Sequence, residues 1–438
     1  MKLLLILSAL FAASAAETAL LEIMKLLLIL SALFAASAAE TAYYEGYVVY
    51  QIRPVTDGQV ELISGFGENA SFDFWNAPKI IGLPTTVMVA PDAQESFVQV
   101  LTAAQIPYTV LIDNVERVVK EERSRQQTMT RLEKGRISFT EYHRYEAIQD
   151  YLAELASSYP DIVGLEEIGA SYQGSAISMV RIGAGSSSNP TIFIEGGIHA
   201  REWISPAFVL YLIQELVENE NNRNMIENVN WLIVPVLNPD GYEYTHTNER
   251  LWRKTRSIGS ICDGVDANRN FGYYWMEAGA SSLECAETYA GPTAFSEPET
   301  SHLRDIINEN LDEIKLFISF HSYGNYIMYP WGYTSQLPYD VEELNSLAVD
   351  VEAAIASVAG TRYTIGSPPQ VLYAAAGGSF DWVKGEAGVD MSYTLELPGG
   401  GSYGFDLPAS RILDVCVETF EGVKVFYNYV EQQSRKSS

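Results

Sequence analysis

The sequence predicts an α/β fold in which a mixed, mostly parallel sheet is flanked by helices and preceded by a small α+β domain of ferredoxin-like order. The first observation is that apolar, β-rich runs alternate with helical patterns over the C-terminal two thirds of the chain; the runs are 191–195, 231–236, 316–320 and 392–397. Strands that alternate with helices favour a sheet covered on both faces. The second observation is the order strand, helix, strand, strand, helix, strand within residues 43–112.

Each element follows from its periodicity. In the small domain, strands are predicted at 44–52, 71–75, 85–89 and 108–112, and helices at 57–66 and 91–104. In the larger part, helices are predicted at 145–157, 206–218, 297–308, 341–359 and 411–429. The triplet that starts at Asn69 fits the pattern of an N-glycosylation acceptor, which also occurs by chance.

Length and charge limit the classes of function. The chain has 438 residues, 47% of them hydrophobic, which is enough for two domains with a large core. Lys and Arg number 28 against 56 Asp and Glu, a formal net charge of -28. Such a charge disfavours nucleic acids and anionic membranes as partners.

The N-terminus predicts secretion. Lys2, an apolar core at 3–11 and small residues at 13–16 are typical of a secretory signal, here 1–19, and the core is too short to span a bilayer. The same 19-residue segment recurs without change at 24–42. We interpret the second copy as an artefact of a duplicated start rather than a structural repeat. A signal anchor is the alternative, although charged residues interrupt the combined apolar run.

Residues 113–136 predict an exposed helix that connects two domains, followed by an activation segment. They are polar and carry basic residues that suit a trypsin-like protease: Arg123, Arg125, Arg131, Lys134 and Arg136. The alternative is a solvated helix face with no further role. Among the three cysteines, Cys262 and Cys285 enclose a loop that a disulfide would close, and Cys416 is expected to be a buried thiol.

Histidines and carboxylates at strand ends predict a metal site. His199 follows the run 191–195 and two glycines, with Glu202 three residues later, and His321 directly follows the run 316–320. Sites of open α/β sheets assemble at the carboxyl ends of strands. Two imidazoles and one carboxylate form a catalytic zinc set with a fourth position open. The other histidines, which are His143, His246 and His302, are expected to be ordinary surface or packing residues.

This set differs from the HExxH pattern, because Glu202 would bind the metal and could not act as the base. Glu396, near the end of the apolar run 392–397, is the candidate base. A buried carboxylate there is unfavourable unless it has a role. Each feature alone is more often structural, and only the combination favours a metal site.

The same residues lie in motifs that resemble the zinc carboxypeptidases of the pancreatic A/B type, the funnelin metallocarboxypeptidases. The resemblance covers about 137–430, with a looser match of 43 to about 130 to the inhibitory pro-domain of that family. The motifs occur in order at 197–203 (GIHAREW), 236–241 (VLNPDG), 251–256 (LWRKTR), 264–270 (GVDANRN), 320–323 (FHSY), 377–379 with Asp381 and Trp382, and Glu396.

The resemblance implies a domain order and a function. It implies an inhibitory pro-domain at 43–112, a connecting segment at 113–136 and a catalytic domain at 137–438, with a sheet of the eight-stranded carboxypeptidase type. It also implies a secreted, monomeric zymogen, consistent with a digestive lumen, that a trypsin-like protease activates. The substrates would be peptides with a free C-terminal carboxylate.

The resemblance also assigns roles to single residues. His199, Glu202 and His321 would bind one zinc ion, Glu396 would be the general base, and Arg253 would stabilise the oxyanion. Asp266 would accept a hydrogen bond from His199. The substrate would contact Arg201, Asn268, Arg269, Ser322, Tyr323, Tyr373 and Phe405, of which Asn268 and Arg269 suit a terminal carboxylate and Tyr373 would close over the substrate. Ser322, Tyr323 and Phe405 could equally be core or rim residues.

Phe380 predicts the specificity. Members of the family that cleave basic residues have an acid at this position, whereas Phe380 offers an apolar wall. We therefore expect an A-type enzyme that removes apolar or aromatic C-terminal residues. The bulk of Phe380 leaves open whether aliphatic or aromatic residues are preferred, and Pro368, Leu372 and the turn at 398–401 depart from the vertebrate pattern. The alternatives are an inactive binding protein on the same fold, a carboxypeptidase of different specificity, and an amidase acting on a non-peptide bond.

Overall fold

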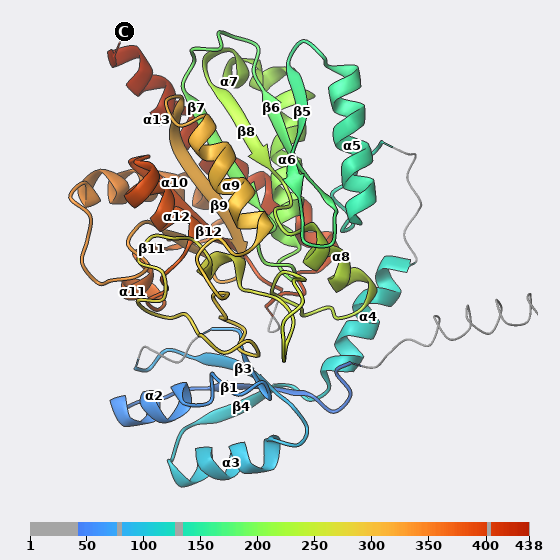
Figure 1. The fold of residues 1–438 in the computed structure, drawn as a ribbon, viewed down its shortest axis with the longest axis vertical. Coiled ribbons are helices and arrows are strands. Elements are labelled where there is room, and N and C mark those ends of the chain that lie inside the picture. The colour runs from blue at the N-terminus through green and yellow to red at the C-terminus, as the bar shows by residue number, and fades with distance from the viewer. Residues whose placement is uncertain (1–42, 77–80, 128–134, 401–403, 438) are drawn as a thin grey trace, which may run out of the picture. The chain divides into compact units, whose positions relative to one another are not determined.

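The computed structural model describes residues 43–76, 81–127, 135–400 and 404–437 (Figure 1). Both copies of the signal, and the candidate cleavage sites Arg131 and Lys134, lie outside these residues. Within the described residues, no helix has the length and apolar character needed to cross a membrane. Residues Tyr44–Ser438 form one compact unit.

The small N-terminal sheet has the predicted order of elements. Its four strands are antiparallel and lie in the order β2-β3-β1-β4. The elements are β1 (Val48–Ile52), α2 (Asp57–Ser64), β2 (Phe72–Phe74), β3 (Thr85–Val89), α3 (Gln94–Ala103) and β4 (Tyr108–Ile112). Because strand side chains alternate, Tyr50 and Ile52 pack with α2 and α3, whereas Val49 faces the opposite side with α4 (Val115–Gln127).

Helix α4 differs from the exposed linker that the sequence predicts. Val118, Val119 and Glu122 are buried, and the valines pack against the face of the small sheet that carries Val49. Glu122 accepts two hydrogen bonds from Arg250, at 2.7 and 3.2 Å. The charged sequence of α4 does not indicate this buried face, because the cationic partner of Glu122 lies more than a hundred residues away in the chain.

The large sheet is mixed and mostly parallel, as predicted. Its order is β11-β10-β12-β9-β7-β8-β6-β5, with the central strands β12, β9, β7 and β8 all parallel. The antiparallel pairs are β10 with β12, β8 with β6, and β6 with β5. The strands are β5 (Val163–Ala170), β6 (Ala176–Ile182), β7 (Thr191–Gly196), β8 (Asn230–Val234), β9 (Ile314–Ser322), β10 (Tyr326–Met328), β11 (Thr364–Gly366) and β12 (Met391–Leu397).

Helices cover both faces of this sheet (Figure 1). One face packs on α5, α6, α10 and α13, and the other on α9 and α12. The helices are α5 (Tyr145–Ser158), α6 (Ile204–Val217), α7 (Arg223–Asn228), α8 (Pro239–Thr247), α9 (Pro298–Glu309), α10 (Val341–Ala359), α11 (Pro368–Val371), α12 (Ser379–Trp382) and α13 (Ile412–Ser437). Four short helical turns complete the described elements: Glu220–Asn222, Ala267–Arg269, Val383–Ala387 and Ala409–Arg411.

The alternation of side chains along the central strands positions the polar residues. In β9, Ile318 and Phe320 belong to the core with α6 and α13, whereas Phe317 belongs to the core with α9. Ser319 and His321 are therefore on the α9 face of β9. By the same alternation, Glu195 in β7 and Glu396 in β12 are on this face.

The cysteines behave as predicted. Cys262 and Cys285 form a disulfide, with their Cα atoms 5.1 Å apart. Cys416 is a buried free thiol in α13.

Candidate active site

The site lies where β7, β9 and β12 end. These parallel strands are neighbours, and their register pairs Gly196 with Phe320 and Glu396 with His321. The chain leaves β7 through Gly197, whose φ of +66° is in the left-handed region that favours glycine. A Cβ at Gly197 would also lie 3.1 Å from the backbone of Val236. This turn directs the chain across the sheet edge before α6 begins.

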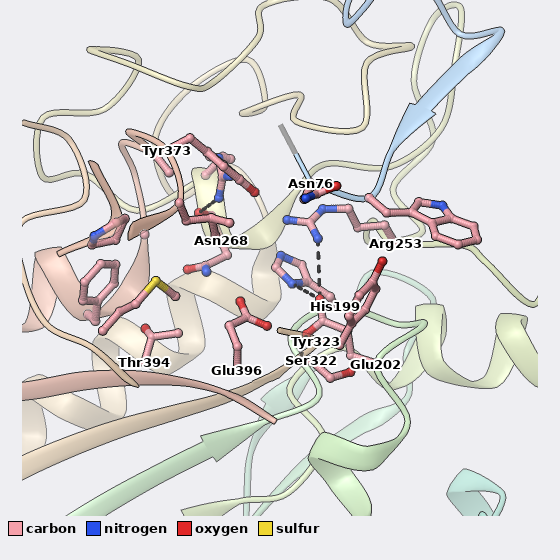
Figure 2. A pocket seen from close by; sticks show the side chains of 18 of the residues that line it. Asn76, His199, Glu202, Arg253, Asn268, Ser322, Tyr323, Tyr373, Thr394 and Glu396 are labelled. Atoms are coloured by element: carbon pink, nitrogen blue, oxygen red, sulfur yellow. Dashed lines mark hydrogen bonds and ion pairs between the residues drawn. The ribbon is translucent and has the colours of Figure 1, made fainter. Parts of the chain in front are cut away.

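Two imidazoles and one carboxylate converge there, those of His199, His321 and Glu202, and Figure 2 shows His199 and Glu202 of this group. Nδ1 of His199 lies 2.8 Å from one oxygen of Glu202, and Nδ1 of His321 lies 3.0 Å from the other. The two Nδ1 atoms are 3.1 Å apart. All three side chains are buried, and one ligand atom of each lies within 4.8 Å of the others. The group could hold a metal ion, and its two nitrogens and one oxygen fit zinc.

The surroundings set the charge of each of these groups. Burial opposes a charge on His321, but Glu202 raises the pKa of this imidazole to about 9, so metal binding would displace a proton from the ring. Burial opposes the charge of Glu202, but the two imidazoles hold the pKa of this carboxyl well below its usual value. Burial and the nearby Arg253 lower the pKa of His199, so its ring is neutral. Nε2 of His199 lies 3.0 Å from Oδ1 of Asp266, the contact that the resemblance implies. A proton on Nε2 leaves Nδ1 free as a ligand.

Arg253 contacts both Asp266 and Glu202. Its Nη2 and Nε donate to Asp266 at 3.0 and 3.2 Å, and its Nη1 lies 3.5 Å from Glu202. Burial disfavours the guanidinium charge, but Asp266 and Glu202 outweigh burial and raise the pKa of Arg253. For Asp266, burial is likewise outweighed by Arg253, Arg269 and His199, which hold its pKa well below its usual value. Arg253 is therefore a fixed positive charge beside the metal-binding group.

Glu396 lies in the same pocket, with its carboxylate toward His199 and Glu202 (Figure 2). Burial raises the pKa of Glu396 to about 7, and the charge of Glu202 adds to this effect, although His321 and Arg253 oppose it. A carboxyl with a pKa near neutral pH is suited to exchange protons during a reaction.

Most residues predicted to contact the substrate line this pocket. The lining includes Arg253, Asn268, Arg269, Ser322, Tyr323, Tyr373, Phe380, Glu396 and Phe405. Arg201 is buried beneath the ring of Phe405, with its guanidinium carbon 4.4 Å from the ring centre. The structure therefore places the predicted residues in or directly beside one pocket.

Phe380 is one of several uncharged side chains that line the pocket. Met328, Leu372, Ala375 and Thr394 line the pocket together with Phe380. The acids among the lining residues are Glu202, which belongs to the metal-binding group, and Glu396. The neighbouring Asp381 accepts backbone hydrogen bonds from Gly332 and Tyr333 at 2.8 and 3.1 Å.

The N-terminal sheet contributes residues that the sequence did not predict for this region. Asp73 in β2 accepts hydrogen bonds from both terminal nitrogens of Arg201, at 2.7 and 3.2 Å. Trp75 and Asn76 line the pocket, and Trp75 also packs edge to face on Phe405. In the sequence, Asp73 is an isolated acid within the aromatic run 72–75, which indicates that it needs a partner, but the sequence does not show which residue that partner is.

Two of the other histidines contact neighbouring residues. His246 stacks on the ring of Trp203 at 4.1 Å, and Nε2 of His143 lies 2.8 Å from the carbonyl oxygen of Ser138. Both therefore have packing or local hydrogen-bonding partners.

The fold and the group of residues that could hold a metal ion indicate a metal-dependent enzyme, and comparison with known proteins gives the family. The zinc carboxypeptidase family matches residues 148–422, and the carboxypeptidase activation peptide matches residues 50–122. The chain therefore belongs to the zinc carboxypeptidases and carries an activation peptide.

Individual relatives agree. Carboxypeptidase B of Astacus astacus is 48% identical over 299 residues, which are 67% of this chain and 99% of the relative. Zinc carboxypeptidase A 1 of Drosophila melanogaster is 37% identical over 391 residues, which are 87% of this chain and 91% of the relative. The crystal structure of carboxypeptidase A from Helicoverpa armigera superposes with a TM-score of 0.85 at 34% identity, over 90% of this chain and 99% of that chain.

The contact between Asp73 and Arg201 yields a prediction about how firmly the N-terminal sheet is held. Asp73→Asn removes the charge opposite a buried guanidinium. Removing one partner of such a pair typically costs about 2 kcal/mol or more, which corresponds to about a 30-fold larger fraction of molecules in which the N-terminal sheet has opened away from Arg201. Backbone amides of β2 should therefore exchange with deuterium about 30-fold faster in the full-length protein.

Glu68→Gln provides the control, because Glu68 is an exposed acid in the same sheet unit. If Asp73→Asn and Glu68→Gln have the same exchange rates as the unsubstituted protein, the ion pair does not hold this sheet in place.

Proposed function

We propose that this protein is a secreted zinc carboxypeptidase zymogen that, once activated by proteolysis, removes apolar C-terminal residues from peptides. The observation that supports it most strongly is the convergence of His199, Glu202 and His321 beside Glu396 and Arg253 in one pocket. The three converging residues would hold the zinc ion. Zinc, when bound, would polarise the scissile carbonyl and make water more acidic.

Glu396 would be the general base. It would take a proton from the attacking water and pass it to the leaving amine. Its support is its place in the pocket, its register beside His321, and a pKa of about 7 that suits both transfers. Burial is the main cause of that pKa, so the packing that forms the sheet edge also gives Glu396 the proton affinity of a general base.

Arg253 would stabilise negative charge on the carbonyl oxygen in the transition state. Because Asp266 holds two of its nitrogens, the guanidinium is fixed before the substrate arrives. A preorganised charge does not have to reorient during the reaction, which makes its effect larger than that of a mobile side chain.

Asn268 and Arg269 would bind the terminal carboxylate, with Tyr373 closing over the substrate. Arg269 Nε donates to the carbonyl oxygen of Gly279 at 2.9 Å, and Oδ1 of Asn268 accepts from the amide of Ser379 at 3.0 Å. These contacts fix both side chains at the pocket wall. A fork of donors at this wall suits a carboxylate.

The pocket around Phe380 supports an A-type specificity. Apart from Glu202 and Glu396, the pocket lining offers no acid to a Lys or Arg side chain, whereas an apolar side chain would gain from burial. The names of the relatives include both carboxypeptidase B and carboxypeptidase A, so the names do not decide this point.

The N-terminal part would be an inhibitory pro-domain. Asp73 engages Arg201, and Trp75 and Asn76 line the pocket, so a substrate would compete with all three. Cleavage by a trypsin-like protease within 113–136 would then free the catalytic domain, 137–438. The signal at the N-terminus supports secretion, and a monomer is sufficient because the site is complete within one chain.

The proposal is tested with the trypsin-treated protein on peptides that end in Phe, Leu, Lys or Glu, with and without a chelator. We expect release of Leu and Phe that the chelator abolishes and added zinc restores. Absence of chelator-sensitive release of any C-terminal residue would contradict the proposed activity. Faster release of Lys than of Leu or Phe would contradict only the specificity.

The role of Phe380 predicts a change of substrate class. In Phe380→Asp, release of C-terminal Lys should rise relative to Leu by at least about tenfold in kcat/KM, because the buried carboxylate pairs only with a cationic side chain. Phe380→Leu is the matched control and should keep the preference for apolar residues. An unchanged ratio of Lys to Leu in Phe380→Asp would show that another residue determines specificity.

The role of Glu396 predicts the acid limb of the pH profile. The base works as a carboxylate, so activity is lost as the pH falls through the pKa of Glu396, which burial raises to about 7 and which a neighbouring metal cation would lower. Below that value, kcat/KM should decrease about tenfold per pH unit.

The profile is measured on the activated protein at constant ionic strength, with circular dichroism at each pH as the control for folding. A flat kcat/KM between about pH 5 and about pH 8 would contradict a base whose pKa lies within that range.

A further inference from the structure

The two imidazoles of the metal-binding group have different outer partners. Both turn Nδ1 toward Glu202, but Nε2 of His199 lies 3.0 Å from the Asp266 carboxylate, whereas Nε2 of His321 lies 2.8 Å from the hydroxyl of Ser319. A neutral imidazole has one protonated nitrogen and one acceptor nitrogen. The partner of Nε2 therefore decides whether Nδ1 is free to bind a metal.

A serine hydroxyl cannot make this decision alone, because it can donate or accept a hydrogen bond. The direction at Ser319 is fixed by a third residue. Ser319 Oγ donates to Oε1 of Glu195 at 2.8 Å. Since a hydroxyl has one proton, and that proton is given to Glu195, the oxygen can only accept from Nε2 of His321.

Asn268 favours the opposite arrangement. Its Oδ1 accepts from the amide of Ser379, so its Nδ2 donors face Nε2 of His321 at 3.4 Å. An amide donor at Nε2 favours a proton on Nδ1, and a protonated Nδ1 cannot bind a metal. The shorter contact with Ser319 opposes this effect only while the hydroxyl proton remains on the side of Glu195.

The sheet register brings the three residues together. Ser319 and His321 are two residues apart in β9, so their side chains are on the same face. Glu195 in β7 pairs directly with Ser319 in the parallel register. All three side chains are fully or almost fully buried. A carboxylate in an otherwise apolar strand is unfavourable unless it accepts hydrogen bonds, so its presence in β7 indicates a role beyond filling space.

We propose that Glu195 and Ser319 are positioning residues: Glu195, acting through the Ser319 hydroxyl, keeps the proton of His321 on Nε2 and so keeps Nδ1 available for the metal. Asp266 does the same for His199 by a direct contact. The inference rests on the zinc site proposed above and extends it to two residues that contact neither metal nor substrate.

The test measures zinc affinity of the full-length protein by competition with a chromophoric chelator after removal of bound metal. Glu195→Gln keeps the size of the side chain but removes the charge and introduces a donor toward Ser319. We expect it to weaken zinc binding about 10- to 100-fold. Thr191→Val is the matched control, because Thr191 is a buried residue of the same strand at its opposite end. It should bind zinc as the unsubstituted protein does.

Two further measurements separate positioning from general damage to the fold. Ser319→Ala should weaken zinc binding to a similar extent. The double variant of Glu195 and Ser319 should bind zinc as well as the single variant with the lower affinity, because both residues act through the same series of hydrogen bonds. Ser319→Ala also keeps the test valid if Glu195→Gln does not fold. NMR with selective ¹⁵N-histidine labelling of the metal-free protein, at a pH at which the ring is neutral, should show a proton on Nε2 of His321 and an altered tautomer in Ser319→Ala.

The outcomes are distinguishable. If the unsubstituted protein does not bind zinc, the proposed function fails and this inference fails with it. If it binds zinc and Glu195→Gln binds equally well, only this inference is overturned. The inference would also be overturned if Thr191→Val lost as much affinity for zinc as Glu195→Gln, or if the losses of affinity in the two single variants added up in the double variant.

Discussion

The bridging position of Glu202 between two imidazoles is the contact on which the rest of the site depends. His199 and His321 lie at the ends of neighbouring parallel strands, and Glu202 joins them. A buried carboxylate is stable only with positive or hydrogen-bonding partners, and the amide of Ser322 supplies one of these at 3.1 Å. A metal ion would supply the charge that this group of ligands lacks. The turn at Gly197 brings His199 and Glu202 to the sheet edge at which His321 of β9 lies.

The same requirement for balanced charge extends outward from the metal-binding group. Arg253 balances Asp266, and Arg201 is balanced by Asp73 from the N-terminal sheet. Glu287 lies 3.6 Å from Arg201 and is a second acid near the same guanidinium. Two guanidinium groups near the metal-binding group, those of Arg201 and Arg253, are thus each held by acids. Asp73 thus holds Arg201, while Trp75 and Asn76, which follow it closely in the chain, line the pocket itself.

Sequence patterns predicted the strands that carry the site better than the strands at the sheet edges. β7 and β9 are buried on both faces, so their apolar runs identify them and place His199 and His321. β5 is largely exposed, and β10 and β11 have three residues each, too few to show a period.

The contacts of Asp73 and of Glu195 could not be predicted, because each depends on the register or packing of segments far apart in the chain. An acid in an apolar strand indicated that a partner was needed, but not which one.

The most direct test of this account is a crystal structure of the full-length protein with zinc, using anomalous diffraction at the zinc absorption edge. The account predicts a single strong peak between His199, Glu202 and His321, with Nδ1 of both imidazoles bound to the metal and both Nε2 atoms turned toward Asp266 and Ser319. A peak at another place, bonding through Nε2, or no zinc at this edge of the sheet would contradict it.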